Sequence, residues 1–175
     1  MGAGKTTLGR LLAGKLNISF VDLDHLIEER YAKSVGQLFE EGGEDEFRRI
    51  ESRMLREIPE TENIIVSTGG GAPLFHGNME YMNRTGLTVY LKVSAAELTN
   101  RLKTVKGKRP LIRNKSDDEL AAFVADTLAQ REEVYNLSQI VFSVEAFGSE
   151  ADMQCVVAGL MESLLKVAYN NPKLS

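Results

Sequence analysis

Residue types that form disulfides or bind metals are scarce in this chain of 175 residues. It has a single cysteine, Cys155, and two histidines, His25 and His76. One cysteine excludes a disulfide within the chain, and the apolar helical run around Cys155 predicts a buried thiol with a structural role. Neither histidine has neighbours that indicate metal binding or base catalysis, so we expect cap or surface residues at both positions.

Long hydrophobic runs and an excess of basic residues are also absent from the sequence. No apolar stretch is long enough to span a membrane, and the first residues do not have the pattern of a signal peptide. The formal net charge of −4 argues against general nucleic-acid binding, since no basic face dominates the chain. We therefore expect a cytoplasmic protein, a monomer, with no membrane or nucleic-acid partner.

Helical and strand patterns alternate along a chain of ordinary composition, 43% hydrophobic and 26% charged. The alternation predicts an α/β fold of three layers, in which helices flank a parallel central sheet. The length predicts one domain over residues 1–175. Ser34, Ser94 and Ser116 each precede Gln or Glu by three residues, which is typical of a helix N-terminus. Strands are predicted at 18–23, 64–67, 88–93 and 141–144, and helices at 5–16, 24–31, 34–39, 44–58, around 79–82 and at 152–169.

The chain begins with most of a phosphate-binding P-loop, Met1-Gly-Ala-Gly-Lys-Thr-Thr7. Gly4, Lys5 and Thr6 supply the last three positions of the pattern G-x-x-x-x-G-K-[ST], and an apolar helical stripe follows at once. Successive N–H groups of such a segment form a nest for phosphate oxygens, and Lys5 would reach the terminal phosphates. The Thr6 hydroxyl is a typical Mg²⁺ ligand, so the motif predicts ATP and Mg²⁺. A flexible N-terminal start is the alternative.

The first glycine of that pattern, and the strand that normally precedes it, are absent from the sequence. A parallel sheet without this strand would leave backbone groups of its neighbours unpaired. We therefore expect the natural protein to carry about ten further residues upstream of Met1, with the pattern of an apolar strand followed by glycine.

Two aspartates, Asp22 and Asp24, close the predicted strand at 18–23. Alternation along an extended chain would turn both carboxylates to one side, toward the ligand crevice at the carboxyl edge of a parallel sheet. One of them can hold the hydration shell of Mg²⁺ while the other accepts a proton from a substrate hydroxyl. The alternative is structural, with Asp24 as the N-cap of the following helix.

Arginine and glycine motifs indicate a site for a substrate carboxylate. Arg48 and Arg49 lie among acids, which is typical of an exposed salt-bridged face, but a guanidinium is also a natural fork for a carboxylate. The turn at 68–72 contains three successive glycines, which permit close approach of a ligand, whereas a plain turn needs only one or two. Arg131, near the end of a later helix, offers a second guanidinium.

The segment from Lys103 to Lys115 contains six basic residues and no acid. It predicts either a solvated surface loop or, in a phosphoryl-transfer enzyme, a mobile lid over about 103–116 that closes on the nucleotide. In the second case one arginine of the segment would stabilise the migrating charge.

Taken together, these segments resemble the shikimate kinase family over essentially the whole chain. The resemblance implies a P-loop kinase that transfers the ATP γ-phosphoryl group to the 3-hydroxyl of shikimate, a step toward chorismate and the aromatic amino acids. Its small-molecule partners would be ATP and shikimate. The matching segments, in their order and spacing, are Gly2–Thr7, Asp22–Asp24, Gly43–Glu51, Ser67–Ala72, Arg109–Leu111 and Arg131–Tyr135.

The resemblance implies that one group of residues binds the acceptor. Asp24 would bind the shikimate hydroxyls and act as the base, within a substrate-binding region of about 24–58. Arg48 and Arg131 would clamp the carboxylate, in a pocket lined by Gly69, Gly70 and Gly71.

A second group would bind the nucleotide and its metal. Thr6 and Asp22 would hold Mg²⁺, with Asp22 acting through water. Lys5 and Arg109, the latter on the phosphates, would join Asp24 as catalytic residues. The nucleotide-binding set implied by the resemblance is Gly2, Ala3, Gly4, Lys5, Thr6, Thr7, Arg101 near adenine, and Arg109.

Two other functions stay open on the sequence. A gluconate-type small-molecule kinase also needs arginines for a carboxylate, although the three-glycine turn and the stretch Phe47–Glu51 favour shikimate. A non-catalytic nucleotide-binding homologue would keep the fold without turnover, and the retention of Lys5, Asp24 and Arg48 argues against it.

Overall fold

The computed structural model describes residues 2–60, 62–105, 112–145 and 149–170. Within this part of the chain, helices alternate with strands that pair in parallel, as the sequence predicted. The chain divides into two compact units, one of residues 5–87 and one that joins residues 2–4 to 88–170. None of the described helices combines the length and the apolar character needed to cross a membrane.

The unit of residues 5–87 contains one pair of parallel strands. β1 (Ser19–Asp22) lies beside β2 (Ile64–Ser67), with Ser19 opposite Ile64 and Asp22 opposite Ser67. This register places the last residues of both strands at one edge. The other elements of the unit are α1 (Lys5–Leu16), α2 (Leu23–Tyr31), α3 (Val35–Glu57), the 3₁₀ helix η1 (Ala72–Leu74) and α4 (Asn78–Thr85).

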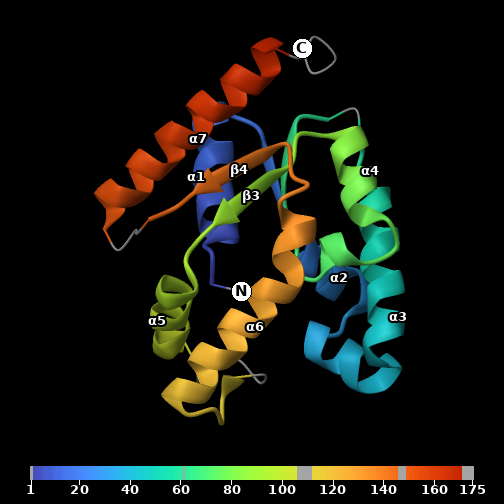
Figure 1. Cartoon of the computed structure of the whole chain (residues 1–175). Helices are drawn as coiled ribbons and strands as arrows, with labels where there is room; N and C mark the ends of the chain where they lie inside the picture. Colours follow the sequence, from blue (N-terminus) through green and yellow to red (C-terminus); the bar gives the residue numbers. More distant parts are fainter. Residues whose placement is uncertain (1, 61, 106–111, 146–148, 171–175) are drawn as a thin grey trace. The chain divides into compact units, whose positions relative to one another are not determined.

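The core of this unit lies between α2 and α3, and Tyr81 and Met82 of α4 pack against it. Figure 1 shows α4 beside α3. Leu23 and Ile27 of α2 are fully buried against the apolar stripe of α3. Phe39 and Phe47 stack within this packing, with ring centroids 4.3 Å apart. The α3 residues buried in this core are Leu38, Phe47, Ile50, Met54 and Leu55.

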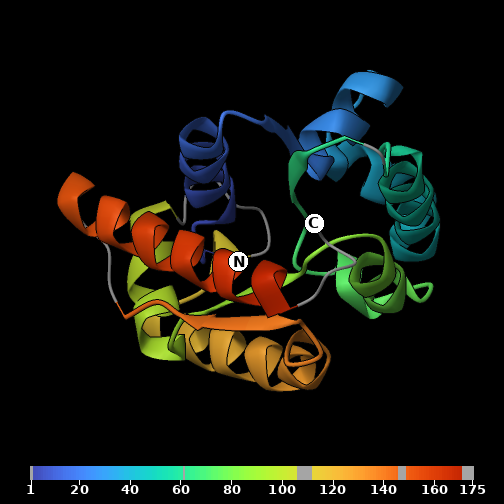
Figure 2. The same ribbon diagram turned by 90° about the horizontal axis from the view of Figure 1, so that it is seen from above.

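The second unit contains the other parallel pair. β3 (Val89–Lys92) lies beside β4 (Ile140–Ser143), with Val89 opposite Ile140 and Lys92 opposite Ser143. Figure 2 shows β4 between α6 (Asp117–Tyr135) and α7 (Glu150–Asn170). α5 (Ala95–Val105) completes the unit and packs on α6. The buried core residues are Val93, Leu98, Leu102, Ile112, Leu120, Val124 and Val144.

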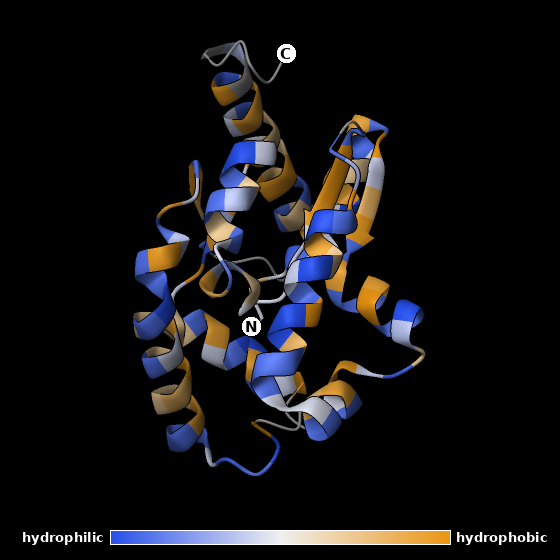
Figure 3. Ribbon diagram, turned by 90° about the vertical axis from the view of Figure 1, so that its right-hand side faces the viewer, coloured by the Kyte–Doolittle hydropathy of each residue, from blue (hydrophilic) through white to orange (hydrophobic). Residues whose placement is uncertain are grey.

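The four strands among the described residues have hydrophobic residues in their middle and end in a polar residue: Asp22, Ser67, Lys92 and Ser143. The hydropathy colouring of Figure 3 shows the mixed faces of the helices against the more uniformly hydrophobic strands. Because parallel strands end at the same edge, each pair presents two polar side chains together. The edge with Asp22 and Ser67 is therefore the natural place for a ligand in the unit of residues 5–87.

α3 is interrupted at Gly43, where φ is 73° and ψ is −179°. A residue with a side chain rarely adopts this conformation, so glycine suits the position. The interruption explains why the sequence predicts two helices, at 34–39 and 44–58, where the structure has one element. Ser34 and Ser116 form full capping boxes with Gln37 and Glu119, as predicted.

Two local predictions were wrong. Cys155 is exposed on α7 instead of buried, because the apolar pattern of that helix does not place the thiol on its packed face. Lys103 lies on α5, which continues to Val105, so the helix extends into the segment predicted as a loop. An ion pair between Lys103 Nζ and Asp117 Oδ2, 3.0 Å apart, joins the helix to the start of α6.

Candidate active site

The edge with Asp22 brings two predicted metal ligands together. Thr6, in the first turn of α1, donates a hydrogen bond from Oγ1 to Asp22 Oδ2 at 2.8 Å. A hydroxyl and a carboxylate are the oxygen ligands that Mg²⁺ prefers, and this ion usually keeps several waters and phosphate oxygens besides. The described residues contain no group of three or more His, Cys, Asp or Glu side chains that could hold a metal. The pair therefore fits a magnesium ion that is bound mainly by water and a nucleotide.

Asp24 lies in a different setting from the one that the sequence suggested. It stands in the first turn of α2, not on an extended strand, so the argument from strand alternation was wrong. The N-cap of α2 is Asp22, whose Oδ1 accepts a hydrogen bond from the backbone N–H of Asp24 at 3.2 Å. The structural alternative, with Asp24 as the cap, was therefore also wrong. Helix α2 begins at Leu23, one residue earlier than predicted. The Asp24 carboxylate therefore does not cap the helix and can interact with a ligand.

Several charges act on the Asp24 carboxyl group. Burial raises its pKa above the usual range of an aspartate, and the negative charge of Asp22 adds to this effect. Lys5 acts in the opposite direction, and of the weaker influences Glu28 raises the pKa and Arg48 lowers it. A carboxylate with a raised pKa holds a proton more firmly than an ordinary aspartate. Asp24 is therefore suited to accept a proton from a hydroxyl.

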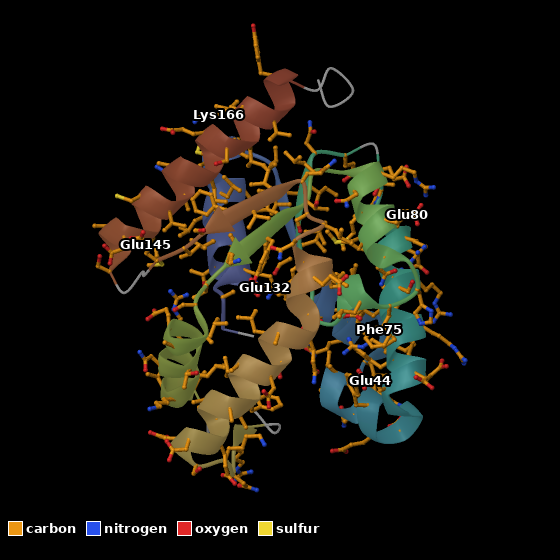
Figure 4. All side chains as sticks on the ribbon, in the orientation of Figure 1. Glu44, Phe75, Glu80, Glu132, Glu145 and Lys166 are labelled. Carbon is orange, nitrogen blue, oxygen red and sulfur yellow. The ribbon has the colours of Figure 1, made fainter. Side chains whose placement is uncertain are left out.

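Arg48 is buried beside this acid on the inner face of α3, at 8% exposure. Its Nη1 donates to Glu51 Oε2 at 2.8 Å, while Nη2 and Nε donate to Glu44 Oε1 at 3.1 and 3.3 Å. The ring of Phe75 lies 4.8 Å from the guanidinium carbon, and Figure 4 shows Phe75 and Glu44 close together. The prediction of an exposed, salt-bridged face is confirmed for Arg49, whose side chain is 70% exposed, and is wrong for Arg48.

The three-glycine turn packs directly on the acid and the arginine. A Cβ on Gly69 would lie 3.1 Å from Asp24 Oδ1 and 2.9 Å from Glu51 Oε1. A Cβ on Gly71 would lie 2.3 Å from Arg48 Nη2, which real contacts do not reach. Gly70 stands between them. The turn thus needs glycine so that Asp24, Arg48 and the backbone can meet.

Glu51 is a site residue that the sequence analysis missed. It is 1% exposed and binds Arg48 from one helical turn further along α3. Its signal was the spacing of three residues between an arginine and an acid on a face that also carries Phe47 and Ile50. Such a pair is usually exposed, so the spacing alone did not distinguish a buried partner from a surface one.

The remaining predicted residues lie at the start of α1 or in the second unit. Gly2, Ala3 and Gly4 lead into α1, whose first residues are Lys5, Thr6 and Thr7. Arg101 of α5 donates from Nε to Glu97 Oε1 at 2.7 Å. Arg109, with the rest of residues 106–111 of the predicted lid, lies outside the described residues.

Arg131 lies half-buried on α6, in a turn that is fixed to β3. Its neighbour Glu132, labelled in Figure 4, forms an ion pair with Lys92 of β3, in which Oε1 and Nζ are 2.7 Å apart. The rings of Tyr90 and Tyr135 pack 5.1 Å apart along the same contact. Burial raises the pKa of Tyr90 to about 12, with smaller contributions from Glu132 and Tyr135, so the phenol stays neutral. The end of α6 is therefore held firmly on its strand.

Residues 1–161 match the family described as shikimate kinase. The chain belongs to the shikimate kinase family. A shikimate kinase from Parabacteroides distasonis is 49% identical over 164 residues, which are 94% of this chain and 95% of that protein.

Solved structures of shikimate kinases agree with this assignment. The enzyme from Bacteroides thetaiotaomicron has a TM-score of 0.90 at 48% identity, and the match covers 94% of this chain and 93% of that one. The enzyme from Acinetobacter baumannii, in complex with shikimate, has a TM-score of 0.80 at 30% identity, with 95% and 89% covered. The predicted α/β P-loop kinase fold is confirmed, as is the activity class of an ATP-dependent phosphotransferase that acts on an alcohol.

Proposed function

We propose that this member of the shikimate kinase family transfers the γ-phosphoryl group of ATP to the 3-hydroxyl of shikimate. The observation that carries the proposal is the cluster of Asp24, Arg48 and the turn Gly69–Gly71, at the strand edge that also holds Thr6 and Asp22. The cluster combines a base, a carboxylate receptor and close backbone approach in one place. A hydroxy acid such as shikimate offers the matching groups.

In this mechanism Asp24 accepts the proton of the acceptor hydroxyl. The hydroxyl oxygen then forms a bond to the γ-phosphorus, and the bond between this phosphorus and the β–γ bridging oxygen breaks, which releases ADP. Burial beside Asp22 favours the protonated Asp24 that the step produces. Base assistance of this kind is typically worth about 10²–10⁴ in rate.

Arg48 and Arg131 orient the acceptor by its carboxylate. A planar guanidinium binds a carboxylate through two parallel hydrogen bonds, which fixes direction as well as distance. Gly69, Gly70 and Gly71 line the same pocket and leave room for the ring. Glu51 holds the Arg48 guanidinium through Nη1, and the acceptor would take over Nε and Nη2 from the exposed Glu44.

The nucleotide binds at residues Gly2 to Thr7, with Lys5 on the terminal phosphates and Arg101 near adenine. Thr6 and Asp22 would hold Mg²⁺, which would neutralise charge on the phosphates. Arg109, in the segment predicted as a lid, stabilises the charge that develops during transfer. These roles follow from the family resemblance and from the hydrogen bond between Thr6 and Asp22.

The two units act together as one kinase domain over residues 1–175, in which residues 24–58 bind the acceptor. We infer a monomer that works in the cytoplasm with ATP and shikimate as its partners. Size-exclusion chromatography with light scattering tests the first part of this inference, since a mass near 19.4 kDa is expected.

A coupled assay of ADP release tests the proposed function. Shikimate, gluconate and a reaction without acceptor are compared at the same MgATP concentration. We expect ADP release only with shikimate, and shikimate 3-phosphate as the product. Turnover with gluconate alone would assign a sugar-acid kinase, and no turnover with either acceptor would assign a nucleotide-binding homologue.

A further inference from the structure

A second arginine-rich surface lies on α3, on a different stripe from Arg48. Arg49, Arg53 and Arg56 follow one another at intervals of four and three residues, so their side chains share one face of the helix. With Ser52, Glu57 and His76 they line an open groove of about 500 Å³. The proposed phosphoryl transfer uses none of these residues.

The groove keeps a positive charge because its guanidinium groups are bound mainly by neutral partners. Nη1 of Arg56 donates to the Ser52 carbonyl oxygen at 2.9 Å and to Asn78 Oδ1 at 2.7 Å. Nη2 of Arg56 donates to the His76 carbonyl oxygen at 3.0 Å. Arg53 donates to the Tyr31 hydroxyl. A hydrogen bond to a neutral oxygen satisfies a donor but leaves the net charge in place.

The acids near the groove do little to offset this charge. Glu57 pairs with Arg30 at 3.0 Å, so its carboxylate already has a cation of its own. Arg49 meets Glu46 only at 3.5 Å, with both side chains more than half exposed. The interaction energy of such an exposed ion pair is small. Three guanidinium groups therefore face the groove against one carboxylate that is already paired.

A buried framework holds Arg56 in place. Asn78 is fully buried, and Ser52 is 7% exposed. Ser52 Oγ donates to Asn78 Oδ1 at 2.8 Å, and Asn78 Nδ2 donates to the Ala72 carbonyl oxygen at 2.9 Å. The turn at His76, where φ is 52°, directs its carbonyl oxygen to the guanidinium. The Arg56 side chain is thus already ordered without a ligand, which lowers the entropy cost of binding one.

We propose that this groove is a binding site for a phosphate dianion, either inorganic phosphate or the phosphate group of a monoester. Guanidinium groups pair with phosphate oxygens through two parallel hydrogen bonds. Side chains one helical turn apart lie about 5–6 Å from each other, so several donors reach one compact ion. A tetrahedral phosphate accepts bonds from several directions, whereas a planar carboxylate offers two oxygens in one plane. The site is separate from the P-loop.

The test is a titration with inorganic phosphate followed by NMR of ¹⁵N-labelled arginine side chains, at constant ionic strength. The P-loop is first saturated with MgADP, so that phosphate binding there does not contribute. We expect saturable shifts of the Arg53 and Arg56 Nε–H signals. Glycerol phosphate replaces inorganic phosphate in a second arm: equal affinity indicates recognition of the phosphate group alone, and tighter binding indicates that the groove also contacts an ester.

Variants make the assignment specific to the groove. Arg53→Gln should weaken phosphate binding about tenfold, the value of one charge-assisted hydrogen bond in a partly solvated site. Arg56→Lys keeps the charge but loses the fork, and should weaken binding several-fold. The matched control is Arg10→Gln, which removes the same charge from an exposed arginine on α1 that lies over Phe20. Thermal melts verify that each variant is folded.

Two results would overturn the proposal. One is a linear, unsaturated shift of the arginine signals with phosphate concentration. The other is equal phosphate affinity in folded Arg53→Gln and Arg10→Gln, since the effect would then reflect net charge and not the groove. Arg49→Gln serves as a second groove variant if Arg53→Gln does not fold.

Discussion

Arg48 and Arg56 stand on the same helix, eight residues apart, in opposite surroundings. Arg48 is buried and bound by two carboxylates, from Glu44 and Glu51. Arg56 is exposed and bound by neutral oxygens from Ser52, Asn78 and His76. A buried charge is tolerated only when it is paired, whereas an exposed one is not so constrained. The partners, and not the residue type, thus decide what each arginine can bind.

The pairing of Arg48 has a consequence for acceptor binding. Glu44 accepts hydrogen bonds from both Nε and Nη2 of Arg48, an adjacent pair of donors that can bind a carboxylate. The Glu44 side chain is 57% exposed and follows the interruption of α3 at Gly43, whereas Glu51 is buried. Glu44 is therefore the partner that the acceptor would displace, and Glu51 the partner that would stay.

The largest expected effect concerns Asp24, the acid of α2 that lies beside Arg48. Asp24→Asn should nearly abolish phosphoryl transfer, by at least about 10²-fold in kcat, because the amide cannot accept the proton. Binding of ATP, measured by calorimetry, should change little. Steady-state assays with shikimate give the rate. Turnover within a few-fold of the parent would show that Asp24 is not the base.

The next effect distinguishes Arg48 from an exposed arginine. Arg48→Ala should raise the acceptor KM by about tenfold or more, because hydrogen bonds to a charged group are worth roughly 1.5–3 kcal/mol. Arg48→Lys should restore little, since an ammonium lacks the planar fork. The matched control is Arg84→Ala, which removes an exposed arginine of α4. A loss of ATP affinity with normal acceptor KM would mean that the carboxylate binds elsewhere.

A smaller effect, opposite in direction, is expected at Glu44. Glu44→Gln removes the negative charge that competes for Arg48 but keeps the size of the side chain. The acceptor KM should fall by up to about fivefold, since an ion pair with an exposed partner such as Glu44 is worth roughly 0.2–1 kcal/mol. The control is Glu46→Gln, which removes an exposed acid of α3 that pairs with Arg49 and not with Arg48. An increase in KM would show that Glu44 helps to hold the acceptor.

The sequence predicted the elements well and their details less well. β2 was predicted at its observed bounds, and the capping boxes at Ser34 and Ser116 were confirmed, because these signals are local. Asp24 was placed on a strand because a strand end and a helix start share the same few residues. The hydrogen bond from the Asp24 N–H to Asp22 decides between them, and no pattern in the sequence shows it.

Burial explains the other gaps in the prediction of the site. Arg48 and Arg49 are neighbours with the same acids around them in the sequence. The packing of α3 on α2 buries Arg48 and leaves Arg49 exposed. Glu51, Glu44 and Phe75 were missed for the same reason, since their roles depend on where Arg48 lies. The thiol of Cys155 shows the reverse error, because an apolar run does not reveal which of its residues face solvent.

The smallest expected effect is on stability and comes from the same acid as the largest one. Folding raises the pKa of Asp24, chiefly through burial. The protonated side chain therefore stabilises the folded state below the pKa of the unfolded chain, and this contribution is lost as the pH rises through the folded pKa. At neutral pH the ionised Asp24 thus destabilises the fold.

Asp24→Asn cannot ionise, so its melting temperature should exceed that of the parent at pH 7. The difference should shrink as the pH falls through the raised pKa of the folded Asp24, since the parent then becomes protonated as well. Thermal melts across this range measure it, with Asp126→Asn, an exposed position on α6, as the control. A lower Tm than the parent at pH 7 would show that the ionised carboxylate is held by favourable contacts, and that burial is not its dominant influence.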